Sequence, residues 1–445
     1  MGTTGMLIIL LLAITLIILL TVRVKMHAFV ALLTACFFIG FATGMPFTKI
    51  LSSIELGMGG FLGMLAPILA LGAIVGKMME VSGGAERLAR TLIDKLGKKN
   101  AHWALMIVGY ICGIPVFFQV GIVLLMPLLY CVAIEAGMSL VTIGIPMIIG
   151  LLTVHCIVPP HPAATAVAIG LKADLGKVIF YGLLVGLPAA ALAGPIFAKA
   201  IGDKFVLNPP AHLCKAEPTP EDKLPPFGIT LFTILFPLLL MISKTALEFM
   251  LGKAHPMMVY VNFIGDPVTA LFLAVFLSYW TLGLNRGMNM EKLQKLSEVA
   301  IGPMAAILLI IGASGAFNKI LMDSGIGAAI KTMLMSWHIN PLVLAWIVAL
   351  AMRAAVGGAT IAMITAVGLV TPVLPMYPGL DPALVAVAIG AGAIGLSHVN
   401  DPGFWFVKEY FGMSMGDLFK TYTLSTTIAS VVGLLALLLL NMVVG

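Results

Sequence analysis

Long apolar runs separated by short polar segments fill almost the whole chain. Ten of these runs are long enough to cross a hydrocarbon core of roughly 30 Å as helices. Those in the first half cover residues 5–21, 28–43, 57–79, 140–153 and 178–200, and the run at 140–153 continues beyond a break. Those in the second half cover residues 229–242, 268–284, 302–321, 382–411 and 419–444. The pattern predicts an all-α polytopic membrane protein.

One further apolar segment in each half carries glycines and polar residues near its midpoint. These segments span residues 101–136 and 341–374, and each is long enough for two short helices that meet at a tip. We therefore expect two re-entrant hairpins, with tips at 113–121 (GIPVFFQVG) and 353–362 (RAAVGGATIA).

Polar residues and prolines interrupt one long span in each half. The first interruption is TVHCIVPPHP at 153–162, and the second lies within GLSHVNDPGFW at 395–405, with the break expected at 398–403. Inside a bilayer, non-helical backbone persists only where protein or a water-filled cavity satisfies its amides. Each broken helix with polar residues therefore indicates a binding site. The alternative for the second interruption is a solvent loop between two separate spans.

The two halves of the chain match each other at an offset near 243 residues. GMPFTKILSSIELGMG from Gly44 aligns with GMNMEKLQKLSEVAIG from Gly287, and His155 aligns with His398. The chain is therefore divided into a first repeat at 1–200, a cytoplasmic linker at 201–227 and a second repeat at 228–445. Each repeat would hold five transmembrane helices, one of them broken, plus a re-entrant hairpin. Because five crossings are odd in number, the second repeat is expected to be inverted relative to the first.

The distribution of basic residues predicts the orientation in the membrane. The chain is 61% hydrophobic and only 10% charged, which excludes a soluble domain, so its net charge of +6 reports topology rather than nucleic-acid binding. Segments assigned to the cytoplasm carry 17 of the 25 lysine and arginine residues, against seven outside. We expect both termini on the outer side. The first apolar run follows MGTT rather than a basic segment, so we expect it to be retained as a span.

This arrangement indicates transport. Inverted repeats with two broken helices and two hairpins are typical of secondary transporters, in which half-helix ends meet near mid-membrane. Helix N-termini offer unpaired N–H groups and partial positive charge, which suits a carboxylate ligand. The P-loop, HExxH and GxSxG motifs are absent, so neither an ATP-driven pump nor an intramembrane enzyme is supported. We expect no cofactor and no metal.

Five polar side chains are the main candidates for this chemistry. Arg353 could bind a carboxylate through two parallel hydrogen bonds, or instead snorkel to the surface or pair with Asp401. Asp401 is the only carboxylate in either break or hairpin tip, and it is the candidate proton carrier. His155, like His161 and His398, could relay protons near neutral pH or serve as a fixed hydrogen-bond partner.

Several motifs resemble the gluconate permease (GntP) family of bacterial proton symporters. They are SHVNDPGFW followed by VKEYFG, the VPPHP of the first break, RxxxGxAT in the second tip and GKMMEVSGGAERLA at 76–89. The resemblance runs from end to end and is closer to the gluconate and idonate branch than to the D-serine branch. Two positions depart from the family: Gln119 stands where a glutamate is usual, and Gly358 stands where a serine is usual.

The resemblance implies an importer of gluconate or a related sugar acid, coupled to protons, in the bacterial inner membrane. It also implies a fold like that of the wider ion-transporter superfamily and a homodimeric assembly. With the basic-residue bias, this places both termini in the periplasm. Another small organic anion, such as a dicarboxylate, a hydroxy acid or a D-serine-like amino acid, carried with sodium or protons, is the alternative. The residues assigned to substrate binding are Arg353, Gly357, Gly358, Thr360, Ser397, His398, Asn400, Thr153, His161 and Gln119, and those assigned to proton coupling are Asp401 and His155.

Overall fold

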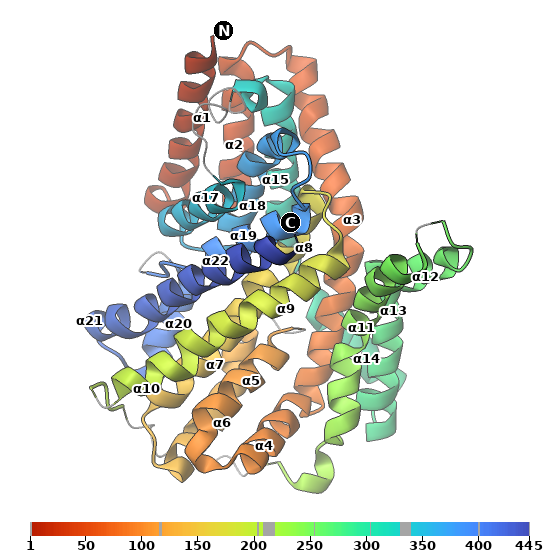
Figure 1. Cartoon of the computed structure of the whole chain (residues 1–445), viewed down its shortest axis with the longest axis vertical. Helices are drawn as coiled ribbons and strands as arrows, with labels where there is room; N and C mark the ends of the chain where they lie inside the picture. The colour runs from red at the N-terminus through yellow and green to blue at the C-terminus, as the bar shows by residue number, and fades with distance from the viewer. Residues whose placement is uncertain are drawn as a thin grey trace.

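The computed structural model describes residues 2–114, 118–202, 204–207, 219–252, 254–302, 304–329, 340–398 and 401–444 (Figure 1). Every regular element in these ranges is a helix. Eight of the described helices are long and apolar enough to cross a membrane, and four shorter apolar helices accompany them. The prediction of an all-helical polytopic membrane protein is confirmed.

Two long helical paths lie against each other along much of the molecule. One is α3 (Phe47–Val81), and the other runs through α14 (Met290–Ile301) and α15 (Met304–Asp323). They cross where Gly57 meets Gly315, and a Cβ atom on Gly57 would lie 2.5 Å from the carbonyl oxygen of Gly315. Helix backbones approach this closely only where both residues lack a side chain.

Helix α3 begins ten residues before the apolar run that predicted it, which started at 57. The segment 47–56 is half polar, so the hydrophobic pattern alone left it out of the span. In the structure, the buried Ser53 donates a 2.7 Å hydrogen bond to Asp323 at the end of α15. Lys319 lies 2.9 Å from the same carboxylate. This polar contact between the two paths accounts for the longer helix.

Two outer groups of helices pack on different parts of these two paths (Figure 1). The first consists of α1 (Thr3–Ile18) and α2 (Ala28–Ala42), and α2 packs on α15. The second consists of α11 (Phe227–Leu251), the short helix α12 (Met258–Ile264) and α13 (Pro267–Ser278), and α13 packs on α3. The apolar pattern did not predict α12.

Both predicted interruptions are present, but their limits differ from the predicted ones. The first lies between α7 (Leu140–Ile157) and α8 (Pro162–Gly170), so the break covers 158–161 rather than 153–162. Val158 has extended backbone, as expected for a residue that precedes a proline, and the helix continues up to that point. Thr153 and His155 therefore lie on regular helix.

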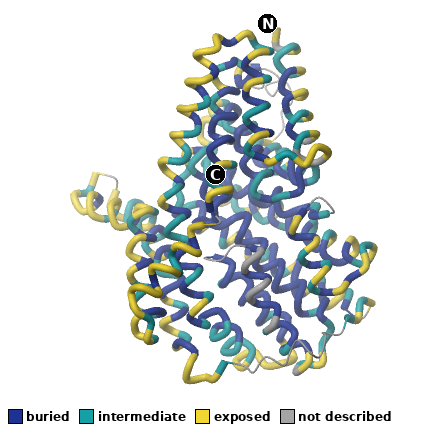
Figure 2. The backbone as a smooth tube through the Cα atoms, turned by 180° about the vertical axis from the view of Figure 1, so that it is seen from behind, coloured by how far each residue is buried: buried dark blue, intermediate teal, exposed yellow. Residues whose placement is uncertain are grey.

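The second interruption lies between α19 (Pro382–Ile394) and α20 (Pro402–Phe411), so the break begins at 395 rather than at 398. Leu396 in this break has a φ of +51°, a left-handed conformation that non-glycine residues seldom adopt. Such conformations persist only where the surrounding structure holds them in place. Almost all residues of α7 and α19 are buried, and the two helices pack together in the core (Figure 2).

Each segment predicted to form a hairpin contains two helices, and residues 115–117 of the first tip lie outside the described residues. The first consists of α5 (Ala101–Cys112) and α6 (Phe118–Ala136), and the second consists of α17 (Pro341–Val356) and α18 (Ala359–Val370). Helix α5 packs along α7, and α17 packs along α19. Helix α18 also packs on α8, while α6 packs on α20. Each hairpin therefore contacts both broken helices.

The last helical path of each half contains a π-helical segment. Helix α9 (Leu175–Ala191) continues through 192–196 into α10 (Phe197–Gly202), and α21 (Met415–Leu418) continues through 419–423 into α22 (Leu424–Val444). Helices α9 and α22 lie side by side (Figure 1).

The amphipathic helix α4 (Gly84–Leu96) holds the end of the segment that joins the two halves. Arg87 donates a 2.9 Å hydrogen bond to the carbonyl of Pro225. Arg90 donates a 2.8 Å hydrogen bond to the carbonyl of Thr219. The chain leading into α11 is thus attached to the first half by side-chain contacts as well as by its covalent connection.

Candidate functional site

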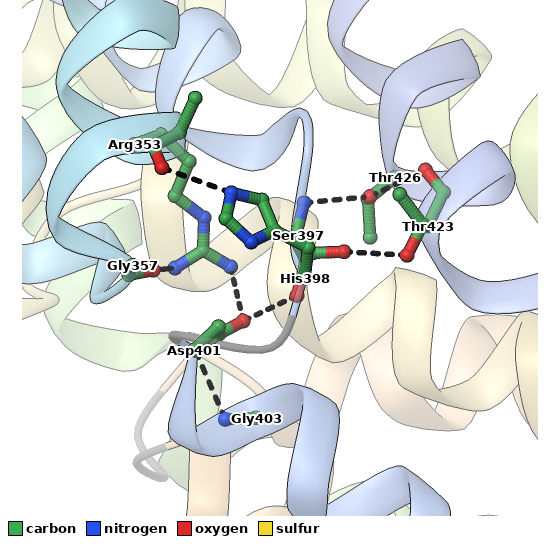
Figure 3. A network of polar contacts seen from close by, with 9 residues as sticks. Arg353, Gly357, Ser397, His398, Asp401, Gly403, Thr423 and Thr426 are labelled. Atoms are coloured by element: carbon green, nitrogen blue, oxygen red, sulfur yellow. Dashed lines mark hydrogen bonds and ion pairs between the residues drawn. The ribbon is translucent and has the colours of Figure 1, made fainter. Parts of the chain in front are cut away.

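The centre of the candidate site is an ion pair between the last turn of α17 and the N-terminus of α20 (Figure 3). Nη2 of Arg353 lies 2.5 Å from Oδ2 of Asp401, and only 1% and 6% of the two side chains are exposed. Oδ2 of Asp401 also accepts a hydrogen bond from the hydroxyl of Ser397. Oδ1 accepts from the amide of Gly403 at 2.9 Å and so caps α20. Two opposite charges and several hydrogen bonds therefore compensate each other in a buried position.

The turn after α17 orients the Arg353 guanidinium. Gly357 has a φ of +90°, which favours glycine, and its amide donates to the carbonyl of Arg353 at 2.9 Å. The carbonyl of Gly357 accepts a hydrogen bond from Nη1 of Arg353. Nε of Arg353 is buried and has no acceptor among the described residues. Buried donors are normally paired, so this one suits a hydrogen bond to an anionic ligand.

The second break is fixed on two sides (Figure 3). Toward α22, the carbonyl of Ser397 accepts from Oγ1 of Thr423 at 2.6 Å, and the amide of Ser397 donates to Oγ1 of Thr426 at 3.4 Å. Toward the second hairpin, Nε2 of His398 donates to the carbonyl of Ala354 at 2.9 Å. The ion pair and the break therefore form one connected network.

The first break contributes a pair of histidines. Nδ1 of His155 on α7 lies 3.4 Å from Nε2 of His161, which precedes α8. The ring of Phe118, at the start of α6, lies 5.9 Å from the His155 ring. The same phenylalanine contacts the second break, because a Cβ atom on Gly403 would lie only 2.8 Å from it. Phe118 thus connects the first hairpin to both breaks.

The remaining predicted residues are placed as follows. Gly358 precedes α18 and Thr360 lies in its first turn. A Cβ atom on Gly358 would have no neighbour nearer than 3.8 Å, so a serine would fit there. The methyl group of Thr153 faces Gly186 of α9. Asn400 lies outside the described residues. Gln119 belongs to α6, but its side chain lies outside the described part of the structure.

Of two cavities among the described residues, the smaller is lined by a predicted site residue and the larger is not. A cavity of about 20 Å³ lies beside His161, between α3 and the first break, and has room for about one water molecule. A larger one, of about 760 Å³, lies between the start of α9 and the end of α11, where Lys177 and Thr245 line it. None of the predicted site residues lines the larger cavity.

The hydrophobic pattern missed the contribution of α22. Residues 419–444 were interpreted only as an apolar span, yet Thr423 and Thr426 hold the backbone of the second break. A signal was available, because TYTLSTT at 421–427 is a dense run of hydroxyl residues within that span. Ser425, also in this run, donates a 2.6 Å hydrogen bond to the carbonyl of Ala193 in the π-helical segment after α9.

The chain has relatives of nearly equal length whose names describe transporters. It is 46% identical to a gluconate permease of Pseudomonas aeruginosa, over 96% of this chain and 95% of the relative. It is also 46% identical to a D-serine transporter of Escherichia coli, over 98% of both chains. A high-affinity gluconate transporter of Escherichia coli is 41% identical, over 98% of this chain and 100% of the relative. Overall identity therefore does not separate the gluconate branch from the D-serine branch.

A solved structure shares the fold. The YdaH transporter of Alcanivorax borkumensis matches with a TM-score of 0.65 and 15% sequence identity, covering 94% of this chain and 98% of that chain. The GntP family permease model matches residues 5–443. These matches identify a membrane transporter rather than an enzyme. The chain belongs to the GntP family of permeases.

Proposed function

We propose that this protein is a secondary active transporter that imports gluconate or a related sugar acid across the bacterial inner membrane by proton symport. The observation that carries the proposal is the buried Arg353, whose Nε has no acceptor among the described residues. A guanidinium presents its donors in a planar fork that matches a carboxylate. The names of the gluconate transporters among the relatives support a sugar acid as the source of that carboxylate.

The hydroxyl groups of such a substrate would be bound by polar groups around the ion pair. Gly358 and Thr360 lie at the N-terminus of α18, where helix amides are unpaired and partially positive. His398 lies in the second break, and the hydroxyl of Ser397 donates to the Asp401 carboxylate that pairs with Arg353. Asn400 is proposed as a further substrate contact from its place in the sequence. Thr153, His161 and Gln119 are proposed to bind the substrate from the first break and the first hairpin.

Proton coupling would follow if the substrate carboxylate competes with Asp401 for Arg353. The guanidinium binds Asp401 in this structure. A substrate carboxylate that takes over part of the guanidinium would leave Asp401 less well compensated, which favours its protonation. Substrate and proton would then each promote binding of the other, as reciprocal coupling requires. His155, with its partner His161, is the second candidate for the proton site.

The inverted-repeat architecture is also a proposal, and paired local features support it. Gly44 and Gly287 end equivalent turns with φ of +74° and +79°. Ser82 and Ser324 each donate a 3.2 Å hydrogen bond to the carbonyl three residues earlier, and a glycine of positive φ follows each serine. The second helix of each hairpin also packs on the second part of the other half's broken helix, α18 on α8 and α6 on α20. A homodimer with periplasmic termini completes the proposed arrangement.

Transport in proteoliposomes tests the function. Purified protein would be reconstituted, and uptake of radiolabelled gluconate would be measured under an inward proton gradient, an inward sodium gradient, or neither. We expect accumulation with the proton gradient alone. Protein-free vesicles are the control for leakage. Uptake that requires sodium would contradict proton symport.

A D-serine carrier is the second candidate, favoured by the relative that is 46% identical over 98% of both chains. D-serine also carries a carboxylate, so Arg353 could bind it in the same way. Parallel assays with radiolabelled D-serine, and competition by each unlabelled compound, separate the two. Uptake of D-serine that excess gluconate does not inhibit would exclude the sugar-acid assignment.

A further inference from the structure

Hydroxyl residues in α22 and at the end of the π-helical segment before it contact three different elements. Thr423 and Thr426 bond to the backbone of the second break, at Ser397. Ser425 bonds to the π-helical segment after α9. Ser430 accepts a 3.0 Å hydrogen bond from the indole of Trp346 on α17. Helix α22 therefore touches the break, the second hairpin and the last helical path of the first half.

Ser397 is the residue through which Thr423 and Thr426 connect to the ion pair. Its side chain is fully buried, its carbonyl and amide are held by α22, and its hydroxyl donates to Oδ2 of Asp401. The Asp401 carboxylate in turn binds Arg353 at 2.5 Å. A displacement of the Ser397 backbone would therefore move a donor away from the carboxylate that orients the arginine.

The π-helical segment at Phe419–Thr423 ends on the residue that makes the shortest of these contacts to the break. A π-helical segment inserts one residue into an α-helix and so changes the direction of the side chains that precede the next regular turn. At the end of this segment the Thr423 hydroxyl donates to the carbonyl of Ser397, while Leu424, the next residue, is exposed.

We propose that Thr423 and Thr426 are positioning residues for the proposed transport reaction, and that they fix Ser397 so that Asp401 and Arg353 keep the geometry required for substrate binding. Neither threonine needs to touch the substrate. The inference rests on the proposed function only in that Arg353 binds the substrate carboxylate. It predicts that the Thr423 hydroxyl, at the end of the π-helical segment before α22, sets apparent affinity through its bond to Ser397.

Replacement of Thr423 by valine tests the proposal, because valine keeps the branched shape and loses the hydroxyl. The net contribution of one hydrogen bond corresponds to about a three- to ten-fold change in an equilibrium constant. Loss of the Thr423 bond to Ser397 should therefore raise the apparent KM by about the same factor. The maximal rate per folded molecule should change much less. Thr423→Ser, which restores the hydroxyl, should return the KM to the wild-type value. Thr426→Val should give a smaller rise, since its contact to Ser397 is longer, at 3.4 Å.

Thr427→Val is the matched control. Thr427 lies on the same helix, and its hydroxyl donates only within that helix, to the carbonyl of Thr423 at 2.8 Å. Its KM should stay at the wild-type value. The amount of folded protein is measured by size-exclusion chromatography for every variant, because a purely structural role would lower that amount and leave the KM unchanged.

The outcomes separate this inference from the function itself. Uptake is measured with whichever of gluconate and D-serine the wild type transports, so a different substrate does not affect the comparison. An unchanged KM in folded Thr423→Val would overturn the proposal. A raised KM that Thr423→Ser does not restore would also overturn it. If Thr423→Val does not fold, the KM of Thr426→Val compared with Thr427→Val decides in the same way.

Discussion

Arg353 has three nitrogen atoms with hydrogen-bond donors, and the structure gives each a different environment. Nη1 binds the carbonyl of Gly357, Nη2 binds Asp401, and Nε has no acceptor among the described residues. A lysine at this position would keep the charge but could not reproduce the planar arrangement. Arg353→Lys should therefore weaken apparent substrate affinity about ten-fold or more, since charge-assisted hydrogen bonds contribute roughly 1.5 to 3 kcal/mol.

Concentration-dependent uptake measures the effect. Arg286→Lys serves as the control, because Arg286 is partly exposed and donates to the carbonyl of Asp222 away from the network. Unchanged affinity with a slower maximal rate would place Arg353 in gating, or in the pair with Asp401 alone.

Substitution of Asp401 tests the proposed coupling of transport to protons. Asparagine cannot release or take up a proton at this position, and it leaves the Arg353 charge less well compensated. Asp401→Asn should abolish accumulation driven by a proton gradient while still allowing substrate counterflow down its own gradient. Counterflow also reports that the variant is folded. Asp417→Asn, at a carboxylate bonded to Ser414 near the start of α21, should keep both activities.

A variant that still concentrates substrate under a proton gradient would remove Asp401 from the coupling mechanism. The proton would then have to be carried by His155, His161 or His398, each of which has a hydrogen-bonding contact in or beside one of the two breaks.

The crossing of α3 and α15 gives a prediction at the scale of helices. A Cβ atom on Gly57 would lie 2.5 Å from a backbone oxygen, whereas one on Gly59 would have no neighbour within 4 Å. Gly57→Ala should lower thermal stability, because a backbone contact cannot yield locally and overpacking costs about 1–3 kcal/mol. Gly59→Ala should be neutral or stabilising, by up to about 1 kcal/mol, since alanine favours helix over glycine. Thermal unfolding in detergent compares the two, and equal midpoints would refute the close crossing.

Most of the long apolar helices and both breaks were predictable from the sequence, but their limits were not, and the short helix α12 was missed. Polar residues in apolar runs marked both interruptions, because a bilayer tolerates such residues only where protein surrounds them. The pattern could not show that α7 continues past His155, since helix persistence there depends on tertiary packing. It also could not show that Ser53 meets Asp323, because that contact joins residues far apart in the chain.

Part of the candidate site was predictable because charged residues are rare within membrane spans. Arg353 and Asp401 were identified as exceptional residue types in a membrane span, and the structure brings them together. Their pairing was one of three possibilities for Arg353 that the residues alone left open. The π-helical segment that turns Thr423 toward Ser397 has no signature in the hydrophobic pattern. Backbone geometry of this kind is set by neighbouring helices.

The orientation in the membrane is a prediction about the whole molecule. The excess of lysine and arginine in one set of connecting segments indicates that residue 99 faces the cytoplasm and residue 378 faces the periplasm. Both positions are exposed, so cysteines placed there can react. In a cysteine-free variant, an impermeant maleimide added to intact cells should label Pro378→Cys and spare Lys99→Cys. Lysed cells supply the control, in which both should react. Labelling of position 99 in intact cells would contradict the proposed orientation, and labelling of both positions would contradict the inversion.

The attachment of the joining segment to α4 bears on whether the chain must be continuous. Arg87 and Arg90 hold the backbone between Thr219 and Pro225, just before α11. The two halves also share extensive contacts, in which α3 lies along α15 and α9 lies along α22. A gene split at codons for 208–218 should therefore give two polypeptides that find each other in the membrane without a peptide bond. Each half could then carry isotopes or probes that the other lacks.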